Sequence, residues 1–427
     1  MNDSAQSQAP RLGIIISMFP ELHETFILRE LVALEQCGVS FEIFSLQRPR
    51  DPITLEDAIR LSTQRTSYSG IITSATMLAL FRVCCTKPLR LFRAIAKLVI
   101  HGRDRPVEIA KNLAILPLSL YIAEQGKKRN ISHWHGHWAN IPTTACWYLG
   151  QIHDQSWSAA IHGEDIFSAN RFLKYKLDES RFTVVCSGFF CHHLKTQLNL
   201  EQPENIHLNY HGLDPLVTTR ARVENSDSCT ANQKLTLVSI GRLVPTKGHD
   251  IVIKACSLLE RAGLDFELQL VGSGPLEQDL KSLVVSQGLG QRVNFKGALA
   301  FGEVLSILEG ADIFVLAPRL IDGHPPDGIP NVIAEAMALG VPVVATRVSA
   351  IPELVIDQTT GCLVESEDIV GVAKAVKQLV ASPNYANQLR DAAREHVAKM
   401  FNQESNISEL LDLFDQYTGT RFIGASA

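Results

Sequence analysis

The first half of the chain alternates short apolar runs with longer amphipathic segments. Residues 12–17 form an apolar run with the length of a buried strand, and residues 25–36 repeat apolar positions at helical spacing. Residues 39–45 predict the next strand, so the chain opens with the strand, helix, strand unit of a doubly wound parallel sheet. A helical and partly basic region spans 55–129, and further strands are predicted at 131–138, 157–162 and 183–186.

A second series of strands and helices follows a polar, turn-rich segment at residues 221–233. Its strands are predicted at 235–240, 266–271, 293–296, 313–317 and 341–346. We therefore expect an α/β protein with two doubly wound, Rossmann-like domains, 1–218 and 219–400, and a C-terminal helix, 401–427, that returns to the first domain. Open α/β sheets bind ligands outside the carboxyl ends of their strands, so a cleft between facing domains is the expected site.

Composition narrows the class of protein. At 427 residues with 46% hydrophobic side chains, the chain can bury the cores of two domains. Its 40 basic and 45 acidic residues give a net charge of -5, which lacks the basic excess of a nucleic-acid binder.

Cysteines and apolar runs indicate the compartment. The nine cysteines lack paired spacings, and residues such as Cys84 and Cys85 lie in apolar stretches, so we expect buried, reduced thiols. The polar residues 1–10 lack a secretory signal, and the apolar run 113–123 is shorter than the ~20 residues of a membrane-spanning helix. We expect a cytoplasmic protein.

A glycine-bearing loop with two cations follows the strand predicted at 235–240. Arg242 can direct two donors at phosphate oxygens, and Lys247 brings a point charge from the far end of the loop. This pair suits a diphosphate. Two exposed cations after a strand are the alternative interpretation.

A second motif, residues 327–340, opens a helix with a proline in its first turn. Free backbone N–H groups at such a helix start can point at an anion. Asp327 precedes the helix and Glu335 lies more than a turn inside it, so the two carboxylates can hold different hydroxyl-bearing parts of an extended ligand. A loop acid and a solvated helix glutamate are the alternative.

Several stretches of the second half occur together in one known family. They are 241–242 with 247–248, 271–275, 293–297 and 327–346. In this order and spacing they resemble family 4 of the retaining glycosyltransferases, which adopt the GT-B fold. The resemblance implies that Arg242 and Lys247 hold the diphosphate of a nucleotide-sugar donor.

The resemblance also implies roles for the two acids. Glu335 would hold the nucleotide ribose and Asp327 would face the transferred sugar, and both are catalytic candidates. The family usually has glutamate where Asp327 stands, so this carboxylate is one methylene shorter. The backbone between the two acids would line the donor site, with Gly328, Ile329, Pro330 and Asn331.

In the first half, three stretches resemble the branch of this family used in exopolysaccharide assembly, including enzymes of the colanic acid type. They are 19–27, 133–138 and 161–166. The resemblance implies that His162 is the histidine of the catalytic cleft, with Asp165 nearby to orient it. A structural histidine is the alternative. The acceptor would be a saccharide or a polyprenyl-linked saccharide.

The family resemblance implies front-face transfer of a hexose with retained anomeric configuration. Negative charge grows on the departing diphosphate, and Arg242, Lys247 and the helix start would stabilise that charge without a metal ion. We therefore expect neither a metal nor a cofactor. The nucleotide diphosphate sugar, of UDP or GDP type, is a substrate.

Two other classes remain open. His133, His135 and His137 alternate along a predicted strand and so point to one side, which can be the metal-ligand face of a hydrolase. A non-catalytic nucleotide-sugar sensor would retain Arg242 and Glu335 as well. Donor hydrolysis in the absence of an acceptor distinguishes the sensor from the enzyme.

A basic segment lies within the first domain. Residues 82–105 contain seven basic residues and one acid, with Leu89, Phe92 and Val99 on one helical face beside Arg93. The pattern predicts either a helix that lies on an anionic membrane surface or a surface helix docked on the first sheet. The first case would make the protein peripheral at the inner face of the cell membrane.

Overall fold

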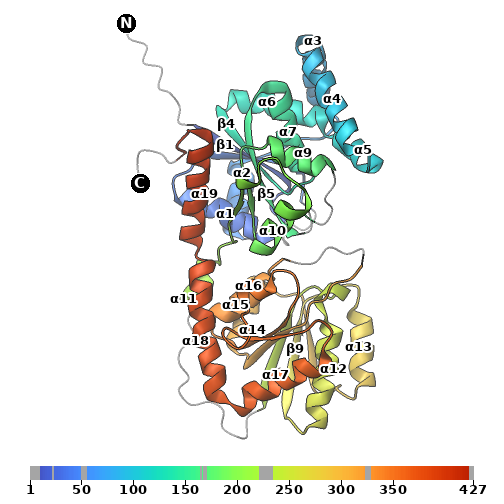
Figure 1. Ribbon diagram of the computed structural model, residues 1–427, viewed down its shortest axis with the longest axis vertical. Coiled ribbons are helices and arrows are strands. Elements are labelled where there is room, and N and C mark those ends of the chain that lie inside the picture. The colour runs from blue at the N-terminus through green and yellow to red at the C-terminus, as the bar shows by residue number, and fades with distance from the viewer. Residues whose placement is uncertain are drawn as a thin grey trace. The chain divides into compact units, whose positions relative to one another are not determined.

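The structure is a computed structural model that describes residues 10–21, 24–49, 55–163, 166, 171–220, 234–322 and 328–422. The chain forms two compact units (Figure 1). Unit 1 comprises Met1–Gly212 and Gln403–Ala427, and unit 2 comprises Leu213–Asn402.

Unit 1 is built on a parallel sheet with the strand order β3-β2-β1-β4-β5-β6-β7. The central strand β1 pairs with β2 and with β4, and Ile14 lies opposite Ile43 on one side and His135 on the other. The central strands are largely buried because helices cover both faces of such a sheet. The strands are β1 Arg11–Met18, β2 Phe41–Gln47, β3 Thr66–Tyr68, β4 Ile131–His137, β5 Ser156–Ile161, β6 Thr183–Val185 and β7 Ile206–Leu208.

Two cores lie on the two faces of this sheet. One contains Trp134 and Trp147, and the other contains Leu12 and, from the last helix of the chain, Phe414. The helices are α1 Thr25–Gln36, α2 Glu56–Gln64, α3 Ser74–Thr86, α4 Pro88–Gly102, α5 Pro106–Ala114, α6 Leu116–Lys128, α7 Ile141–His153, α9 Arg171–Glu179, α10 Gly188–Gln197 and α19 Gln403–Thr418.

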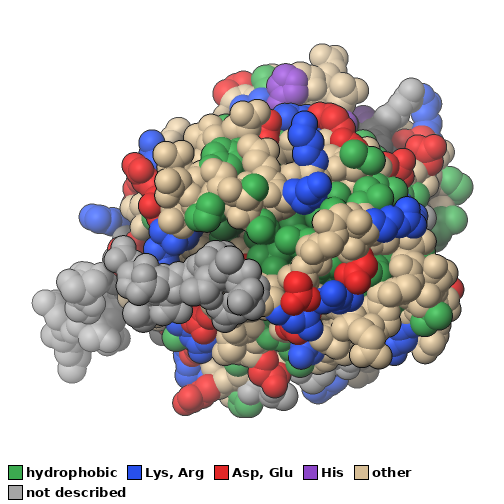
Figure 2. Space-filling model, turned by 90° about the horizontal axis from the view of Figure 1, so that it is seen from below, with side chains coloured by type: hydrophobic (Ala, Val, Ile, Leu, Met, Phe, Trp, Pro, Cys, Tyr) green, Lys and Arg blue, Asp and Glu red, His purple; other side chains and the backbone are tan. Residues whose placement is uncertain are grey.

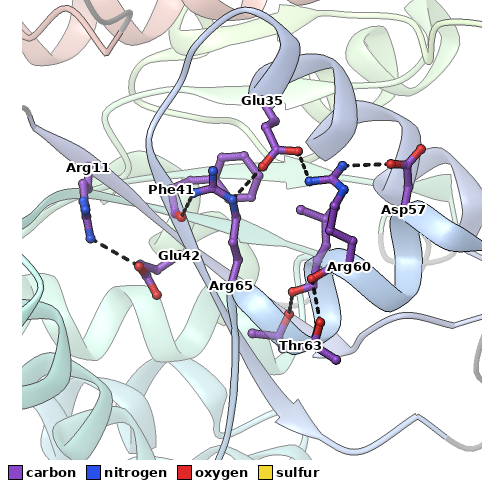
Figure 3. Close-up of polar contacts among 10 residues, drawn as sticks. Arg11, Glu35, Phe41, Glu42, Asp57, Arg60, Thr63 and Arg65 are labelled. Carbon is purple, nitrogen blue, oxygen red and sulfur yellow. Dashed lines mark hydrogen bonds and ion pairs between the residues drawn. The ribbon is translucent and has the colours of Figure 1, made fainter.

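An ion-pair network joins α1 to the segment around α2 (Figure 3). The carboxylate of Glu35 accepts a hydrogen bond from Arg65 Nε at 2.8 Å and also pairs with Arg60. Arg60 in turn pairs with Asp57 at 2.8 Å, and Arg65 donates to the carbonyl oxygen of Phe41 at 3.2 Å. Exposed pairs of this kind contribute about 0 to 1 kcal/mol each, so the network mainly sets how these elements lie on the core.

Unit 2 contains a second parallel sheet, with the strand order β10-β9-β8-β11-β12-β13. The predicted pair of doubly wound domains is therefore confirmed. The strands are β8 Leu235–Ile240, β9 Phe266–Val271, β10 Val293–Gly297, β11 Ile313–Leu316, β12 Val343–Thr346 and β13 Cys362–Val364. The helices are α11 Pro215–Thr219, α12 His249–Arg261, α13 Glu277–Ser286, α14 Phe301–Glu309, α15 Asn331–Ala338, α16 Ile351–Leu354, α17 Ile369–Ala381 and α18 Pro383–Met400.

The structure corrects two expectations about apolar segments. Cys84 and Cys85 are exposed rather than buried, because α3 turns Ala79 and Val83 inward and leaves the two thiols on the outside. The helical stretch Pro106–Lys128 is longer than the apolar run that we took from the sequence. By length and composition it could cross a membrane, but 44% of its apolar window is buried within the protein.

Candidate functional site

The predicted diphosphate loop lies where the strand order of unit 2 reverses. β8 lies between β9 and β11, and the helix α15 follows β11 along the chain. Two adjacent strands whose connections leave in opposite directions open a crevice at their carboxyl ends. Arg242 follows β8 and Asn331 begins α15, so both belong to this carboxyl edge.

The two predicted cations differ in their surroundings. Arg242 is exposed, and no described residue gives its guanidinium a partner. Lys247 ends the short 3-10 helix Pro245–Lys247 and is half-buried. The next residue, Gly248, has φ +66°, and an added Cβ would lie 1.7 Å from the carbonyl oxygen of Ala317. Only glycine allows this close approach, which holds the loop against the end of β11.

Arg319 holds the same loop in place through hydrogen bonds. The sequence does not indicate this residue's role. Its Nε donates to the carbonyl oxygen of Pro245 at 3.0 Å, and its backbone N–H donates to that of Thr246 at 3.0 Å. Arg319 thereby fixes the turn that presents Lys247. Nothing in the local sequence around Arg319 indicates a partner more than 70 residues earlier.

The glycines after β9 shape the crevice through backbone contacts. The N–H of Leu243 donates to the carbonyl oxygen of Ser273 at 2.9 Å, and the N–H of Leu276 donates to that of Leu243 at 3.0 Å. A Cβ on Gly274 would lie 2.6 Å from the carbonyl oxygen of Leu243. The loops after β8 and β9 are therefore locked together.

Glu335 is buried, with 6% of its surface exposed, inside α15. It is therefore not the solvated helix glutamate of the alternative interpretation. Pro330 is the N-cap residue of α15 and is buried, whereas Gly328, Ile329 and Asn331 are half-buried. Asp327 lies outside the described residues.

His162 lies directly after β5 at the carboxyl edge of the unit 1 sheet. Its Nδ1 lies 3.2 Å from Nε2 of His211, and its Nε2 lies 3.5 Å from Nδ1 of His137. The rings of Phe26 and Trp138 lie 4.7 and 4.8 Å from the His162 ring, centroid to centroid. The histidine is thus part of an aromatic cluster at the end of β1, β4 and β5. Asp165 lies outside the described residues.

Burial sets the charge of this cluster. It lowers the pKa of His162 well below its usual value, and the neighbouring His211 and His137 add to the effect. Burial also lowers the pKa of His211 to about 3. Both imidazoles are therefore neutral at neutral pH. Burial raises the pKa of Glu24, at the start of α1, to about 7, although contact with Trp138 opposes the shift.

Sequence reasoning also missed His211 and Phe26 as neighbours of His162. The rings of Phe26 and His211 are stacked, with centroids 4.3 Å apart and planes at 12°. His211 follows the short strand β7, and no pattern around it indicates a site.

The three alternating histidines of β4 have different partners and do not form one group of possible metal ligands. Both ring nitrogens of His133 lie within hydrogen-bond distance of serines, Ser156 at 2.9 Å and Ser158 at 2.8 Å, so this ring has a structural role. His137 Nε2 lies 3.3 Å from a carboxylate oxygen of Glu30. Glu30, His135 and His137 form one group whose ligand atoms could hold a metal ion, and His162, Cys186 and His211 form another.

Two hollows occur among the described residues of unit 1. A small one, of about 20 Å³, is lined by Arg29, Glu30, His211 and Gln403 among others, and it has room for one water molecule. A larger one, of about 190 Å³, lies beside Tyr68, Tyr121, Gln125 and Arg129, and none of the predicted site residues lines it.

Each of the two units is doubly wound and carries polar residues at the point where its strand order reverses. This is the two-domain architecture of GT-B glycosyltransferases. Residues 224–396 match the model of the family Glycosyl transferases group 1. The family resemblance of the second half is confirmed.

Curated relatives of the chain are named as glycosyltransferases. The chain is 32% identical over 212 residues to the putative colanic acid biosynthesis glycosyltransferase WcaL of Salmonella typhimurium. The aligned residues cover 49% of this chain and 51% of the relative. It is 32% identical over 185 residues to the amylovoran biosynthesis glycosyltransferase AmsK of Erwinia amylovora, covering 43% of this chain and 46% of the relative. These matches span about half the length of the curated relatives.

Solved structures resemble the whole chain. A glycosyltransferase from Rickettsia africae has a TM-score of 0.71 at 16% identity and covers 96% of this chain and 98% of its own. HepE of Anabaena, in complex with UDP, has a TM-score of 0.71 at 15% identity and covers 95% of this chain and 100% of its own. At such identities the likeness shows the fold, and the predicted GT-B fold is confirmed.

Proposed function

We propose that this protein is a retaining hexosyltransferase that works without a metal ion. It moves a hexose from a nucleotide diphosphate sugar to a saccharide acceptor, carried on a lipid, during exopolysaccharide assembly. The observation that supports this most is the strand order of unit 2: Arg242 and Lys247 follow β8 and α15 follows β11, and these two neighbouring strands flank the point where the order reverses. The names of the relatives WcaL and AmsK support the exopolysaccharide context.

In this proposal Arg242 and Lys247 bind the donor diphosphate. Arg242 is exposed and without a protein partner among the described residues, so its guanidinium is available for a ligand. The backbone N–H groups of Asn331 and Val332, at the start of α15, are free of intrahelical partners and add positive potential at the same edge. As the bond between the anomeric carbon and the diphosphate breaks, these groups stabilise the departing charge.

The acids hold the sugars of the donor. Glu335 accepts hydrogen bonds from the ribose hydroxyls, and Asp327 faces the hexose. The acceptor oxygen forms its bond to the anomeric carbon on the face that the diphosphate leaves. The acceptor's proton passes to an oxygen of the departing phosphate, so the step needs no cofactor.

His162 orients the reacting sugar in this proposal. Its imidazole is neutral, and its Nδ1 already contacts His211 at 3.2 Å. The contact of its Nε2 with His137 is longer, at 3.5 Å, so in this proposal Nε2 is the nitrogen that meets a sugar hydroxyl. It lines the carboxyl edge of unit 1, where we place the acceptor. We also propose that the reaction takes place in the cytoplasm.

The first experiment is donor turnover. Purified protein is mixed with UDP-, GDP- and ADP-sugars in the presence of EDTA, and the released nucleoside diphosphate is measured. We expect release from one donor and its loss in Glu335→Ala. Glu260→Ala is the matched control, because Glu260 is an exposed glutamate at the end of α12.

Each outcome separates the candidate functions. Release that EDTA abolishes and Zn²⁺ restores would contradict metal independence and favour the group formed by Glu30, His135 and His137. Donor binding that depends on Glu335 without release, even when saccharide acceptors are supplied, would identify a sensor.

A further inference from the structure

Helix α4 is apolar on two opposite faces. Leu91, Ala94 and Leu98 are buried in unit 1, where α4 packs against α7 and α9. The opposite face carries Leu89 and Phe92, each 71% exposed, followed by Val99 and Ile100 about two turns after Phe92. A surface helix of a globular protein normally presents polar residues there. The sequence predicts either a helix on a membrane surface or a surface helix docked on the protein. The helix is docked on unit 1, but it leaves an apolar face uncovered.

The neighbouring helix α3 also exposes an apolar face. It packs against α6 through Ala79 and Val83, and it turns Met77, Leu78 and Phe81 outward, with exposed fractions of 44%, 47% and 64%. The two helices contact one another, and in Figure 1 they stand out from the rest of unit 1. We call this region the α3–α4 surface, made of Met77, Leu78, Phe81, Leu89, Phe92, Val99 and Ile100.

The clustering distinguishes this surface from scattered apolar residues. Seven of the eighteen large apolar side chains that are exposed among the described residues belong to it. Single exposed apolar residues are normal, whereas a contiguous patch marks an interaction site. The two exposed thiols, Cys84 and Cys85, lie on the same helix pair.

Basic side chains border the patch. Arg93, Arg103 and Arg105 are exposed, and no described residue pairs with their guanidinium groups. Arg82 and Arg90 already pair with Glu124 and Asp154, so they add less. In contrast, acidic and basic side chains are intermixed over the face of the molecule in Figure 2.

We propose that the α3–α4 surface binds an anionic lipid bilayer. Phe81, Leu89 and Phe92 enter the boundary between headgroups and acyl chains, while Arg93, Arg103 and Arg105 contact lipid phosphates. A pair of projecting helices with an exposed apolar face and cationic residues beside it suits this occupant, because a bilayer accepts a convex surface that has no matching groove. The lipid-linked acceptor of the proposed function supplies a reason for membrane contact, but the binding itself does not depend on it.

The test is flotation of the full chain with lipid vesicles. We expect co-flotation with vesicles of phosphatidylglycerol and phosphatidylcholine, weakened by salt, and little with phosphatidylcholine alone. Leu89→Glu combined with Phe92→Glu should weaken binding by roughly tenfold or more. Val285→Glu combined with Val370→Glu is the matched control, since these apolar residues of unit 2 are 75% and 66% exposed.

Arg93→Glu combined with Arg103→Glu tests the cationic border and should reduce binding to the anionic vesicles. Maleimide labelling gives a second readout, because vesicles should slow the modification of Cys84 and Cys85. Circular dichroism and donor turnover in solution show that each variant folds, since the patch lies outside the donor site.

Failure to co-float at low salt, or equal binding by the Leu89 and Phe92 variant, would overturn the proposal. Self-association that the same variant abolishes, without vesicle binding, would assign the surface to a second copy of this chain. Vesicle binding by a protein without donor turnover would keep this inference and remove the proposed function.

Discussion

Arg319 pairs with Asp250 across the loop that carries Lys247. Its Nη1 and Nη2 lie 3.2 Å from the two carboxylate oxygens of Asp250, which stands in the first turn of α12. Arg319 is 20% exposed and Asp250 is 19% exposed, so the pair is shielded from solvent more than an ordinary surface pair. With the bonds to Pro245 and Thr246, it ties the segment after β11 to the residues on both sides of Lys247.

Arg319→Ala should therefore weaken donor binding without touching the donor. We expect the KM for the donor to rise by about tenfold while kcat changes less, because the loop loses its fixed position but keeps Lys247. Steady-state release of nucleoside diphosphate gives both constants. Arg390→Ala is the control, since Arg390 pairs with its neighbour Asp391 on α18. An unchanged KM would show that the loop holds its shape without Arg319.

Gly248→Ala should destabilise unit 2 by about 3 kcal/mol or more, because the new Cβ would overlap the carbonyl oxygen of Ala317. Gly263 is a matched control with φ +76° and no atom within 4 Å of an added Cβ. Gly263→Ala should cost only about 1 kcal/mol, the strain of a left-handed backbone. Urea unfolding of both variants measures the difference. Equal losses would mean that backbone strain, and not the close approach, explains the glycine.

If His162 orients the reacting sugar as proposed, His162→Gln should lower kcat for transfer by roughly 100-fold while donor binding persists, because the substitution removes the imidazole. Single-turnover transfer to an acceptor and donor titration separate these two quantities. His192→Gln provides the control, since His192 is exposed on α10. If the His162 variant transfers sugar with an unchanged kcat, this histidine has only a structural role in the aromatic cluster.

The buried histidines should make unit 1 less stable in acid. Burial lowers the pKa of His133 and of His211 to about 3, so only the unfolded chain binds their protons between about pH 6.5 and 3. The free energy of unfolding should therefore fall as the pH drops, by on the order of 2 kcal/mol for each such histidine between pH 7 and 5.

Glu24 acts in the opposite direction. Its pKa of about 7 means that the folded chain binds the extra proton, so its contribution to stability is lost as the pH rises through 7. Urea unfolding from pH 7 to 5, compared between the natural chain and His133→Gln, measures the balance. A pH dependence that is no shallower in the variant would contradict the assignment to His133.

Much of the fold could be predicted from sequence because its central strands are long apolar runs. β1 buries five consecutive residues and β8 buries five of its six, which leaves one consistent interpretation of those segments. The edge strands β3, β7 and β13 have three residues each, too few to show a periodicity, so the sequence does not predict them. β2 begins two residues later than predicted, since the hydrophobic pattern fixes element boundaries poorly.

The candidate site could be predicted only where it lies on continuous motifs. Arg242, Lys247 and Glu335 stand in stretches whose order and spacing indicate the family. His211 lies beside the predicted His162 and Arg319 lies beside the predicted diphosphate loop through the fold alone, at separations of 49 residues from His162 and 74 from Pro245. No local pattern encodes such contacts.

The helix α19 has a consequence for how the chain is made. Its residues Ile407, Leu410 and Phe414 complete the core that begins with Leu12 and Ile14. During synthesis the ribosome delivers all of unit 2 before these last apolar side chains emerge, while domains generally fold as they are released. Unit 2 can therefore finish folding while one side of the first sheet is still uncovered. The N-terminal half matures last, although it is made first.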